Sequence, residues 1–312
     1  MENKKYSLLI VALYCFAGHI REVVSHLKEK NPLVDITILT NKPDDYKDLV
    51  SKFAEICFYD VSSVNWIKFP SLRFLATKYK QIRFFSKFSK NRKFDIINIH
   101  FANRYMSFVY KYLRNMSNII VMSPWGSDIL RRPEKNLQQL SYLYQKADYI
   151  TIPAESDFGR VITQKFKVSP KKMINFGIWG SDVVDFALKK GNTISQENAK
   201  DRFGLSGRYV ITCGYNRQEA QQHKAIIEAI DQKRKQLPKN LTLLFPMTYG
   251  NMVYQGQYVN EIKEECEKRN FNAKFVTEFL SVEDLYKLRK ATDMFIHVQT
   301  TDTGARSVYE YI

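Results

Sequence analysis

Short apolar runs rich in β-branched residues alternate along this chain with longer amphipathic segments, and this alternation constrains the fold strongly. Such runs, bounded by turn residues, are typical of buried strands, and strands separated by helical segments indicate βαβ units and a parallel sheet. The first half therefore predicts a Rossmann-like domain, with a helix over Ile20–Lys30. Its predicted strands are Leu8–Leu13, Val34–Thr40, Asp95–His100, Asn118–Met122 and Tyr149–Ile152.

The second half repeats this alternation after a polar stretch without apolar runs. Its predicted strands are Tyr209–Gly214, Leu241–Phe245, Ala273–Val276 and Met294–Val298, and its predicted helices are Gln222–Gln236, Tyr258–Arg269 and one capped by Ser281. We therefore predict an N-terminal Rossmann-like domain over residues 1–187, a linker over 188–207 and a C-terminal Rossmann-like domain over 208–312. Because the sequence stops soon after the last strand, we expect this second domain to be incomplete.

The formal net charge is +16, which favours anionic partners: nucleic acid, an anionic bilayer surface or phosphorylated substrates. No zinc-finger, RNP-type or helix-turn-helix pattern is present, so we expect no nucleic-acid partner. The four cysteines, at positions 15, 57, 213 and 266, form no CxxC pair and have no histidine at zinc-ligand spacing. They indicate reduced thiols in a cytoplasmic protein.

The apolar run Leu8–Ala17 follows two lysines but is shorter than the roughly 20 residues of a spanning helix. No convincing cleavage site follows it, so a buried first strand explains it better than a signal peptide. We find no longer apolar run, and any membrane association is expected to be peripheral.

Residues 61–94 are basic and aromatic, and contain no acidic residue. The basic residues are Lys68, Arg73, Lys78, Lys80, Arg83, Lys87, Lys90, Arg92 and Lys93, interleaved with aromatic and leucine side chains. Such a segment can lie in a membrane interface, with its rings down and its lysines toward anionic headgroups. There are two alternatives. The segment is a solvated basic helix that packs its aromatic residues on the domain core, or it is a nucleic-acid-binding surface.

Several motifs in the first half resemble the retaining glycosyltransferases of family 4. Phe94–Ala102 is similar to their strand and histidine-bearing turn, and Val121–Asp128 to their WGSD segment. Ala147–Thr151 is the next segment similar to these enzymes, and Gly180–Phe186 matches the G-x-D-x-x-x-F pattern that they carry just before the linker. In this order the motifs cover most of residues 1–186.

The second half resembles the bacterial 4-acetamido-4,6-dideoxygalactose (Fuc4NAc) transferases at Phe245–Gly250, Tyr258 and Gln222–His223. Asp302 and Glu310 stand eight residues apart, like the acid pair of family 4. Together these resemblances imply an α/β protein of the GT-B type, with two Rossmann-like domains that face each other across a cleft.

The resemblance also implies site residues. The catalytic candidates are Asp128, His100 and Asp302; the donor-binding candidates are Arg217, His223, Lys224, Tyr249, Gly304 and Glu310; the acceptor-side candidates are Gly18 and Trp125. A helix N-terminus suits a diphosphate, and Arg217 and Lys224 would neutralise the leaving nucleoside diphosphate, so we expect no metal and no cofactor. Asp128 as a helix cap and His100 as a structural histidine remain the alternatives.

The expected function is transfer of a sugar from a nucleotide-sugar donor to a lipid-linked or oligosaccharide acceptor in bacterial surface-polysaccharide synthesis, such as capsule or O-antigen, at the inner face of the plasma membrane. The acid pair favours retention of anomeric configuration, whereas the Fuc4NAc transferases invert it, and both outcomes stay open. The rival functions are an inactive nucleotide-sugar-binding fragment, a nucleotide-sugar epimerase and a nucleic-acid-binding protein.

Overall fold

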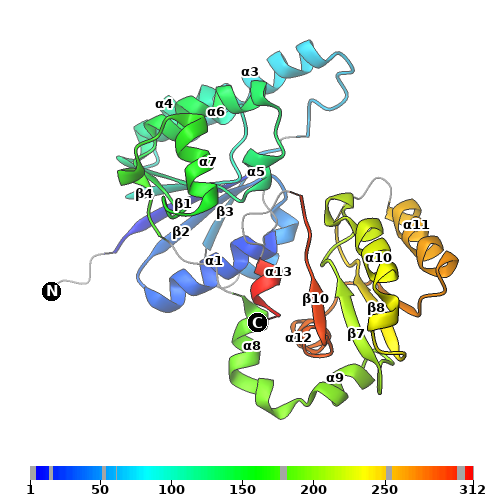
Figure 1. Cartoon of the computed structure of the whole chain (residues 1–312). Coiled ribbons are helices and arrows are strands. Elements are labelled where there is room, and N and C mark those ends of the chain that lie inside the picture. The colour runs from blue at the N-terminus through cyan, green and yellow to red at the C-terminus, as the bar shows by residue number, and fades with distance from the viewer. Residues whose placement is uncertain are drawn as a thin grey trace. The chain divides into compact units, whose positions relative to one another are not determined.

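The computed structural model describes residues 5–13, 17–50, 54–60, 62–175, 181–250, 255–300 and 306–311. The contacts divide the chain into two compact units, Met1–Trp179 and Gly180–Ile312. Each unit is built on its own parallel sheet with helices on both faces (Figure 1).

The sheet of the first unit has six parallel strands in the order β3-β2-β1-β4-β5-β6. The strands are β1 (Ser7–Ala12), β2 (Asp35–Thr40), β3 (Ala54–Phe58), β4 (Ile96–His100), β5 (Ile119–Ser123) and β6 (Tyr149–Ile150). This is the strand order of the dinucleotide-binding fold, in which the order reverses between the first and fourth strands. The central strands are buried because helices cover both of their faces.

Helix α1 (Ala17–Lys30) covers one face of this sheet through Ile20, Val23 and Val24. The opposite face carries α3 (Pro70–Phe88), α4 (Met106–Met116), α6 (Glu134–Lys146) and α7 (Asp157–Phe166) (Figure 1). Two four-residue helices, α2 (Lys47–Val50) and α5 (Ser127–Leu130), lie in the connections.

The sheet of the second unit has four parallel strands in the order β10-β7-β8-β9. The strands are β7 (Tyr209–Cys213), β8 (Leu241–Pro246), β9 (Ala273–Val276) and β10 (Met294–Ile296). Helices α10 (His223–Gln232) and α11 (Gln255–Lys268) pack on one face, and α9 (Gln196–Asp201) and α12 (Val282–Lys290) on the other. The unit also contains α8 (Asp182–Lys190) and α13 (Arg306–Tyr309).

The structure confirms the predicted α/β class with parallel sheets. Ser281 caps α12 as expected, because its side chain accepts a hydrogen bond from the backbone N–H of Asp284. The sequence analysis missed β3, an edge strand that pairs with β2 alone. Its sequence AEICF lacks the uniform apolar character of the central strands, since Glu55 points outward and pairs with Arg92.

Residues 188–207, predicted as a linker, belong to the second unit in the structure. They include α9, whose first residue follows the capping side chain of Ser195. Ala199, Phe203 and Leu205 are buried in the same core cluster as Leu244 and Leu288. The polar composition of this stretch reflects its solvent-facing side, while a few apolar residues fix it to the sheet.

Candidate functional site

The first candidate site lies where the strand order of the first sheet reverses, between β1 and β4. In open parallel sheets, ligands bind in the crevice at the carboxyl ends of the strands at this switch point. His19 follows β1, His100 ends β4, and Trp125 follows β5, which pairs with β4 through His100 and Ser123. The sheet thus brings together residues that are far apart in the sequence.

Trp125 is the centre of this group. Its indole ring makes edge contacts with His19, His100 and Phe101, with ring centroids 5.1, 6.2 and 6.0 Å away. Its Nε1 donates to Nδ1 of His100 at 3.3 Å. Phe101 has φ of 50°, a left-handed conformation that costs a bulky residue about 1–3 kcal/mol and that is concentrated at functional sites. We therefore describe His19, His100, Phe101, Trp125 and Asp128 as the Trp125 cluster.

Asp128 is completely buried, and its Oδ1 accepts a hydrogen bond of 2.9 Å from the backbone N–H of Trp125. Its Oδ2 accepts no hydrogen bond from any residue that the structure describes. Burial raises the pKa of Asp128 to about 6, although nearby backbone N–H groups and Arg132 oppose the shift. In this conformation Asp128 holds the turn that carries Trp125 and does not reach solvent, so a role in positioning fits better than direct contact with a substrate.

His100 is also buried, with 2% of its surface exposed. Burial lowers its pKa to about 3, so the ring is neutral at pH 7. Because the indole donates to Nδ1, the ring proton must lie on Nε2. The predicted catalytic role of His100 stays a prediction, and its geometry makes it a fixed acceptor for Trp125.

Gly18, predicted with Trp125 to lie on the acceptor side, is in the first turn of α1 beside His19. His19 was missed as a site residue by the sequence analysis. Its side chain is 40% exposed, and its Nδ1 lies 3.6 Å from Oε2 of the buried Glu22. The signal that could have found it is its place just after the first strand, at the switch point of the predicted sheet. Among His19, His100 and Asp128, His19 is the titratable group that reaches solvent.

The second candidate site lies at the carboxyl ends of β7 and β10, where the order of the second sheet reverses. Gly214 follows β7 with φ of 64°, and a Cβ there would lie 2.7 Å from the Gln221 side chain and 2.9 Å from Nε2 of His223. Only glycine fits this turn. The turn brings Tyr215 beside His297, with ring centroids 5.5 Å apart, and its hydroxyl donates to Gln299 at 2.8 Å.

Arg217 and Tyr249, two of the predicted donor-binding residues, meet at this edge. The backbone N–H of Arg217 donates to the carbonyl of Tyr249 at 2.8 Å, and its guanidinium donates to the carbonyl of Thr248 at 3.2 Å. Among the described residues no carboxylate forms an ion pair with Arg217. Tyr249 is 43% exposed as a residue, and its hydroxyl interacts with the side chains of Asn216 and Ser307. An arginine without a described carboxylate partner is therefore joined through its backbone to a partly exposed tyrosine.

His223 and Lys224 open α10 but face different surroundings. His223 is fully buried, its Nδ1 lies 3.0 Å from the Tyr258 hydroxyl, and burial lowers its pKa to about 4. Lys224 forms an ion pair of 2.8 Å with Glu261, which raises the pKa of Lys224. His223 therefore packs against the turn of Gly214, whereas Lys224 is paired with a residue of α11.

Glu310 forms a buried ion pair with Arg289, with 2% and 5% of their side chains exposed. Its Oε2 accepts from two nitrogens of Arg289 at 3.2 and 3.3 Å, and its Oε1 accepts from the Ser181 hydroxyl at 3.0 Å. The Glu310 carboxylate is therefore enclosed by these partners. Asp302 and Gly304 lie outside the described residues.

Residues 10–153 match the family model described as glycosyl transferase 4-like. Comparison with curated proteins gives no match.

Solved structures align with almost the whole chain. A glycosyltransferase from Rickettsia africae aligns with a TM-score of 0.67 and 15% identity, over 99% of this chain and 77% of its own. The HepE protein of Anabaena, solved with UDP-glucose, aligns with a TM-score of 0.63 and 12% identity, over 98% and 78%. A UDP-GlcNAc 2-epimerase from Neisseria meningitidis, bound to UDP-GlcNAc, aligns with a TM-score of 0.51 and 12% identity, over 93% and 76%. The chain therefore has the GT-B fold, and its first unit carries the match to the glycosyl transferase 4-like model.

Proposed function

We propose that this protein is a glycosyltransferase that moves a sugar from a nucleotide-sugar donor to an acceptor. One observation carries the proposal: Arg217, a cation without a described carboxylate partner, is held by a backbone hydrogen bond to the partly exposed Tyr249 at the switch point of the second sheet. A diphosphate requires such a cation, and a nucleobase stacks on such a ring. The UDP-glucose bound by HepE and the UDP-GlcNAc bound by the epimerase support a UDP-sugar as donor.

In this proposal the acceptor binds the first unit at the Trp125 cluster. Trp125 offers an apolar ring to a sugar, and His19 is placed to receive the proton of the acceptor hydroxyl, because Glu22 orients it and it reaches solvent. Asp128 and His100 act through Trp125 by fixing its backbone and its indole nitrogen. Arg217 neutralises the leaving diphosphate, so the reaction is proposed to need no metal. With His19 as the base, direct displacement inverts the anomeric configuration; the retention that the resemblance to family 4 implies would instead require the leaving diphosphate to take the acceptor proton.

We further propose that the protein works at an anionic membrane surface, on a lipid-linked or oligosaccharide acceptor for surface polysaccharide such as capsule or O-antigen. Helix α3 supports this, because it has two different faces. One packs on the first unit through the buried Thr77, Gln81 and Phe85. The opposite face carries Leu72, Leu75 and Tyr79. Together with Trp66 and Phe69, which precede the helix, these residues are defined here as the α3 outer face, and each is between 56% and 79% exposed.

Basic residues of α3 lie next to this outer face. Lys80, Arg83 and Lys87 line a pocket of about 430 Å³ together with Phe58, Tyr59, Asp60 and Phe84, and Lys80 pairs with Asp60. Exposed rings and leucines bordered by lysines match the boundary between acyl chains and anionic headgroups. None of the helices in the described part of the chain combines the length and hydrophobicity that a membrane span requires. The contact would therefore be made by this outer face.

The decisive experiment measures binding of UDP-glucose and UDP by calorimetry, followed by release of UDP with and without a lipid-linked sugar acceptor. Arg217→Gln should weaken UDP binding by about tenfold to a hundredfold, since it removes a charge-assisted hydrogen bond. The matched control is Arg208→Gln, an exposed arginine of the same unit, which should bind UDP like the wild type.

The rival functions give different results in the same assay. Interconversion of two UDP-sugars without an acceptor would identify an epimerase. UDP-sugar binding without turnover, with every acceptor tried, would identify a nucleotide-sugar-binding protein. Absence of UDP binding by the wild type would reject the donor site.

A further inference from the structure

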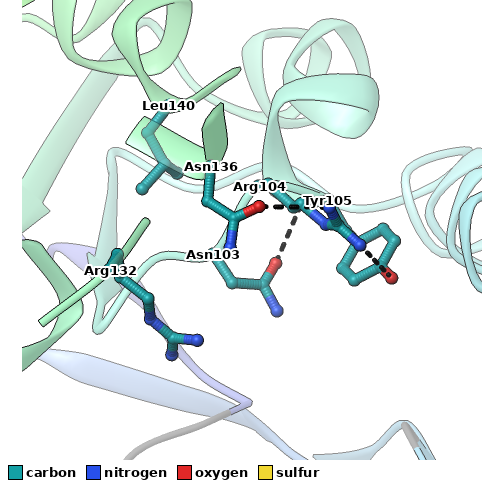
Figure 2. Close-up of a pocket in the computed structure, with 6 residues that line it drawn as sticks. All are labelled: Asn103, Arg104, Tyr105, Arg132, Asn136 and Leu140. Carbon is teal, nitrogen blue, oxygen red and sulfur yellow. Dashed lines mark hydrogen bonds between the residues drawn. The ribbon is translucent and has the colours of Figure 1, made fainter. Parts of the chain in front are cut away.

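A pocket of about 200 Å³ in the first unit is lined by hydrogen-bond donors. Its described lining residues are Asn103, Arg104, Tyr105, Arg132, Asn136 and Leu140, and none of these is acidic (Figure 2). Two arginines supply permanent positive charge, and the two asparagines and the tyrosine supply further donors. This combination distinguishes the pocket from the Trp125 cluster beside it, which contains the carboxyl group of Asp128.

Arg104 is held in one orientation. Its guanidinium lies over the rings of Phe74 and Tyr105, at 4.7 and 5.1 Å from their centroids. It donates to the Asn136 Oδ1 at 3.1 Å and to the Tyr105 hydroxyl at 3.3 Å (Figure 2). These contacts use two of its five N–H groups. Because the fold already orders this guanidinium, a ligand that binds it loses little additional side-chain entropy.

Arg132 is the second cation and is less committed. Its side chain forms no hydrogen bond or ion pair with another described residue, although its charge interacts with Asp128, and its guanidinium lies 5.8 Å from the centroid of Phe101. Asn103 uses its Oδ1 to accept from the backbone N–H of Tyr105 at 3.0 Å, which leaves its amide N–H groups available. Figure 2 shows the side chains of Arg132 and Asn103 extending in the same direction.

Two helices also begin at this pocket, which adds to its positive potential. Tyr105 is the N-cap of α4, and Asn136 lies in the first turn of α6. Helix N-termini carry partial positive charge and favour anions. The acidic residue of this turn, Glu134, is paired with Lys165 at 3.1 Å and does not line the pocket.

We propose that this pocket binds a phosphoryl group carried by the acceptor. The inference rests on the proposed function and adds a chemical class to the acceptor. Two guanidinium groups with amide donors match the several oxygens of a phosphoryl group through charge-assisted hydrogen bonds. Phe101 links the two sites, since its ring contacts both Arg132 and Trp125. An acceptor with its phosphoryl group at the arginines would thus place its sugar near the Trp125 cluster.

The test uses the full chain and three probes: octyl phosphate, glucose 6-phosphate and inorganic phosphate. Each is titrated by calorimetry at constant ionic strength, with saturating UDP and without it, so that binding at the donor site is separated from binding at the pocket. The variants are Arg132→Gln and Arg104→Gln, and the control is Arg160→Gln, an exposed arginine of α7. Thermal unfolding of each variant checks that it folds, and Arg132→Lys keeps the charge without the planar fork.

Arg132→Gln should weaken binding of octyl phosphate or glucose 6-phosphate by about tenfold or more, with Arg132→Lys between it and the wild type. Arg160→Gln should match the wild type, and UDP affinity should not change in any of these variants. Equal binding of the organic phosphates to all variants, or no binding at all, would overturn the proposal. Inorganic phosphate bound as tightly as both organic phosphates would reject the acceptor as the source. Failure of UDP to bind the wild type would count against the proposed function, and the titrations without UDP would still test the pocket.

Discussion

The indole nitrogen of Trp125 donates to Nδ1 of His100 at 3.3 Å, and this bond fixes the tautomer of a histidine that stays neutral at pH 7. This hydrogen bond makes His100 a residue that positions the Trp125 ring. Because the Trp125 ring also contacts His19 and Phe101, the bond supports a surface built from three parts of the chain.

Trp125→Phe provides the first prediction. It keeps an aromatic ring at the cluster and removes the N–H donor to His100, which should cost about 1 kcal/mol of stability. The KM for the acceptor should rise several-fold, while the affinity for UDP stays at the wild-type value. Trp125→Ala should raise the acceptor KM further. An effect of either variant on UDP binding that exceeds its effect on acceptor KM would contradict the assignment of Trp125 to the acceptor.

The second prediction concerns the pH dependence of stability through Asp128. Its folded pKa of about 6 lies above its ordinary value of 3.8, because burial disfavours the carboxylate. The unfolded chain therefore releases the proton first, so the contribution of Asp128 is complete below pH 3.8 and is lost as the pH rises through 6. The shift of about two units corresponds to about 3 kcal/mol.

Asp128→Asn keeps an oxygen that can accept from the backbone of Trp125 and removes this titration. At pH 7.5 the variant should melt at a temperature equal to or higher than that of the wild type, and at pH 4 the difference should shrink. Differential scanning calorimetry across this range measures it. A lower melting temperature for Asp128→Asn at pH 7.5 would show that the buried carboxylate is compensated by other groups.

The third prediction concerns His223 and the loss of stability at acidic pH. Burial lowers its pKa from 6.5 to about 4, so its contribution to stability is present above pH 6.5 and is lost as the pH falls toward 4. His223→Gln should reduce the loss of melting temperature between pH 6.5 and 4. An equally steep loss of melting temperature in His223→Gln and in the wild type over this range would contradict the prediction.

The strands that the sequence predicted best are those covered by helices on both faces. Residues Leu8–Leu13 and Asn118–Met122 are almost entirely apolar because β1 and β5 are buried in the sheet. The edge strand β3 lacks this signal, since one side of it meets solvent and carries Glu55. The helix within residues 188–207 was not predicted because it is short and lies on the surface, so its few buried residues stand among many polar ones.

The candidate site was predictable only in part. The segment Val121–Asp128 marks the turn of Trp125, and the structure gathers it with His100 as the parallel strands require. The role of His19 depends on a ring contact across 106 positions of the chain, and no local pattern encodes it. The bond between Ser181 and Glu310 spans 129 positions and likewise follows from the tertiary fold alone.

Glu310→Gln is the fourth prediction. It leaves the buried Arg289 without a counter-charge, and breaking a buried ion pair costs about 3 kcal/mol. The melting temperature should fall clearly, whether or not the nucleotide also contacts Glu310. The matched control is Glu283→Gln, which breaks the solvent-exposed pair with Lys287 and should cost less than about 1 kcal/mol. Equal melting temperatures for the two variants would contradict the buried pair.

The last prediction concerns the α3 outer face. Vesicles that contain anionic phospholipid should bind the protein, and vesicles of neutral lipid should bind it less, because the basic residues of α3 border the exposed rings and leucines. Each lysine or arginine engaged at the surface contributes about 1 kcal/mol, so replacing Lys80, Arg83 and Lys87 together by glutamine should lower the binding constant by more than tenfold. Leu75→Ser with Tyr79→Ser should weaken binding to the same vesicles at high salt, where screening has removed most of the charge attraction. Leu188→Ser, at a more exposed leucine of the second unit, is the control for loss of an apolar side chain. Sedimentation with vesicles measures all three, and if the α3 variants sediment like the control, the membrane contact lies on another part of the protein and the α3 outer face must bind a different partner.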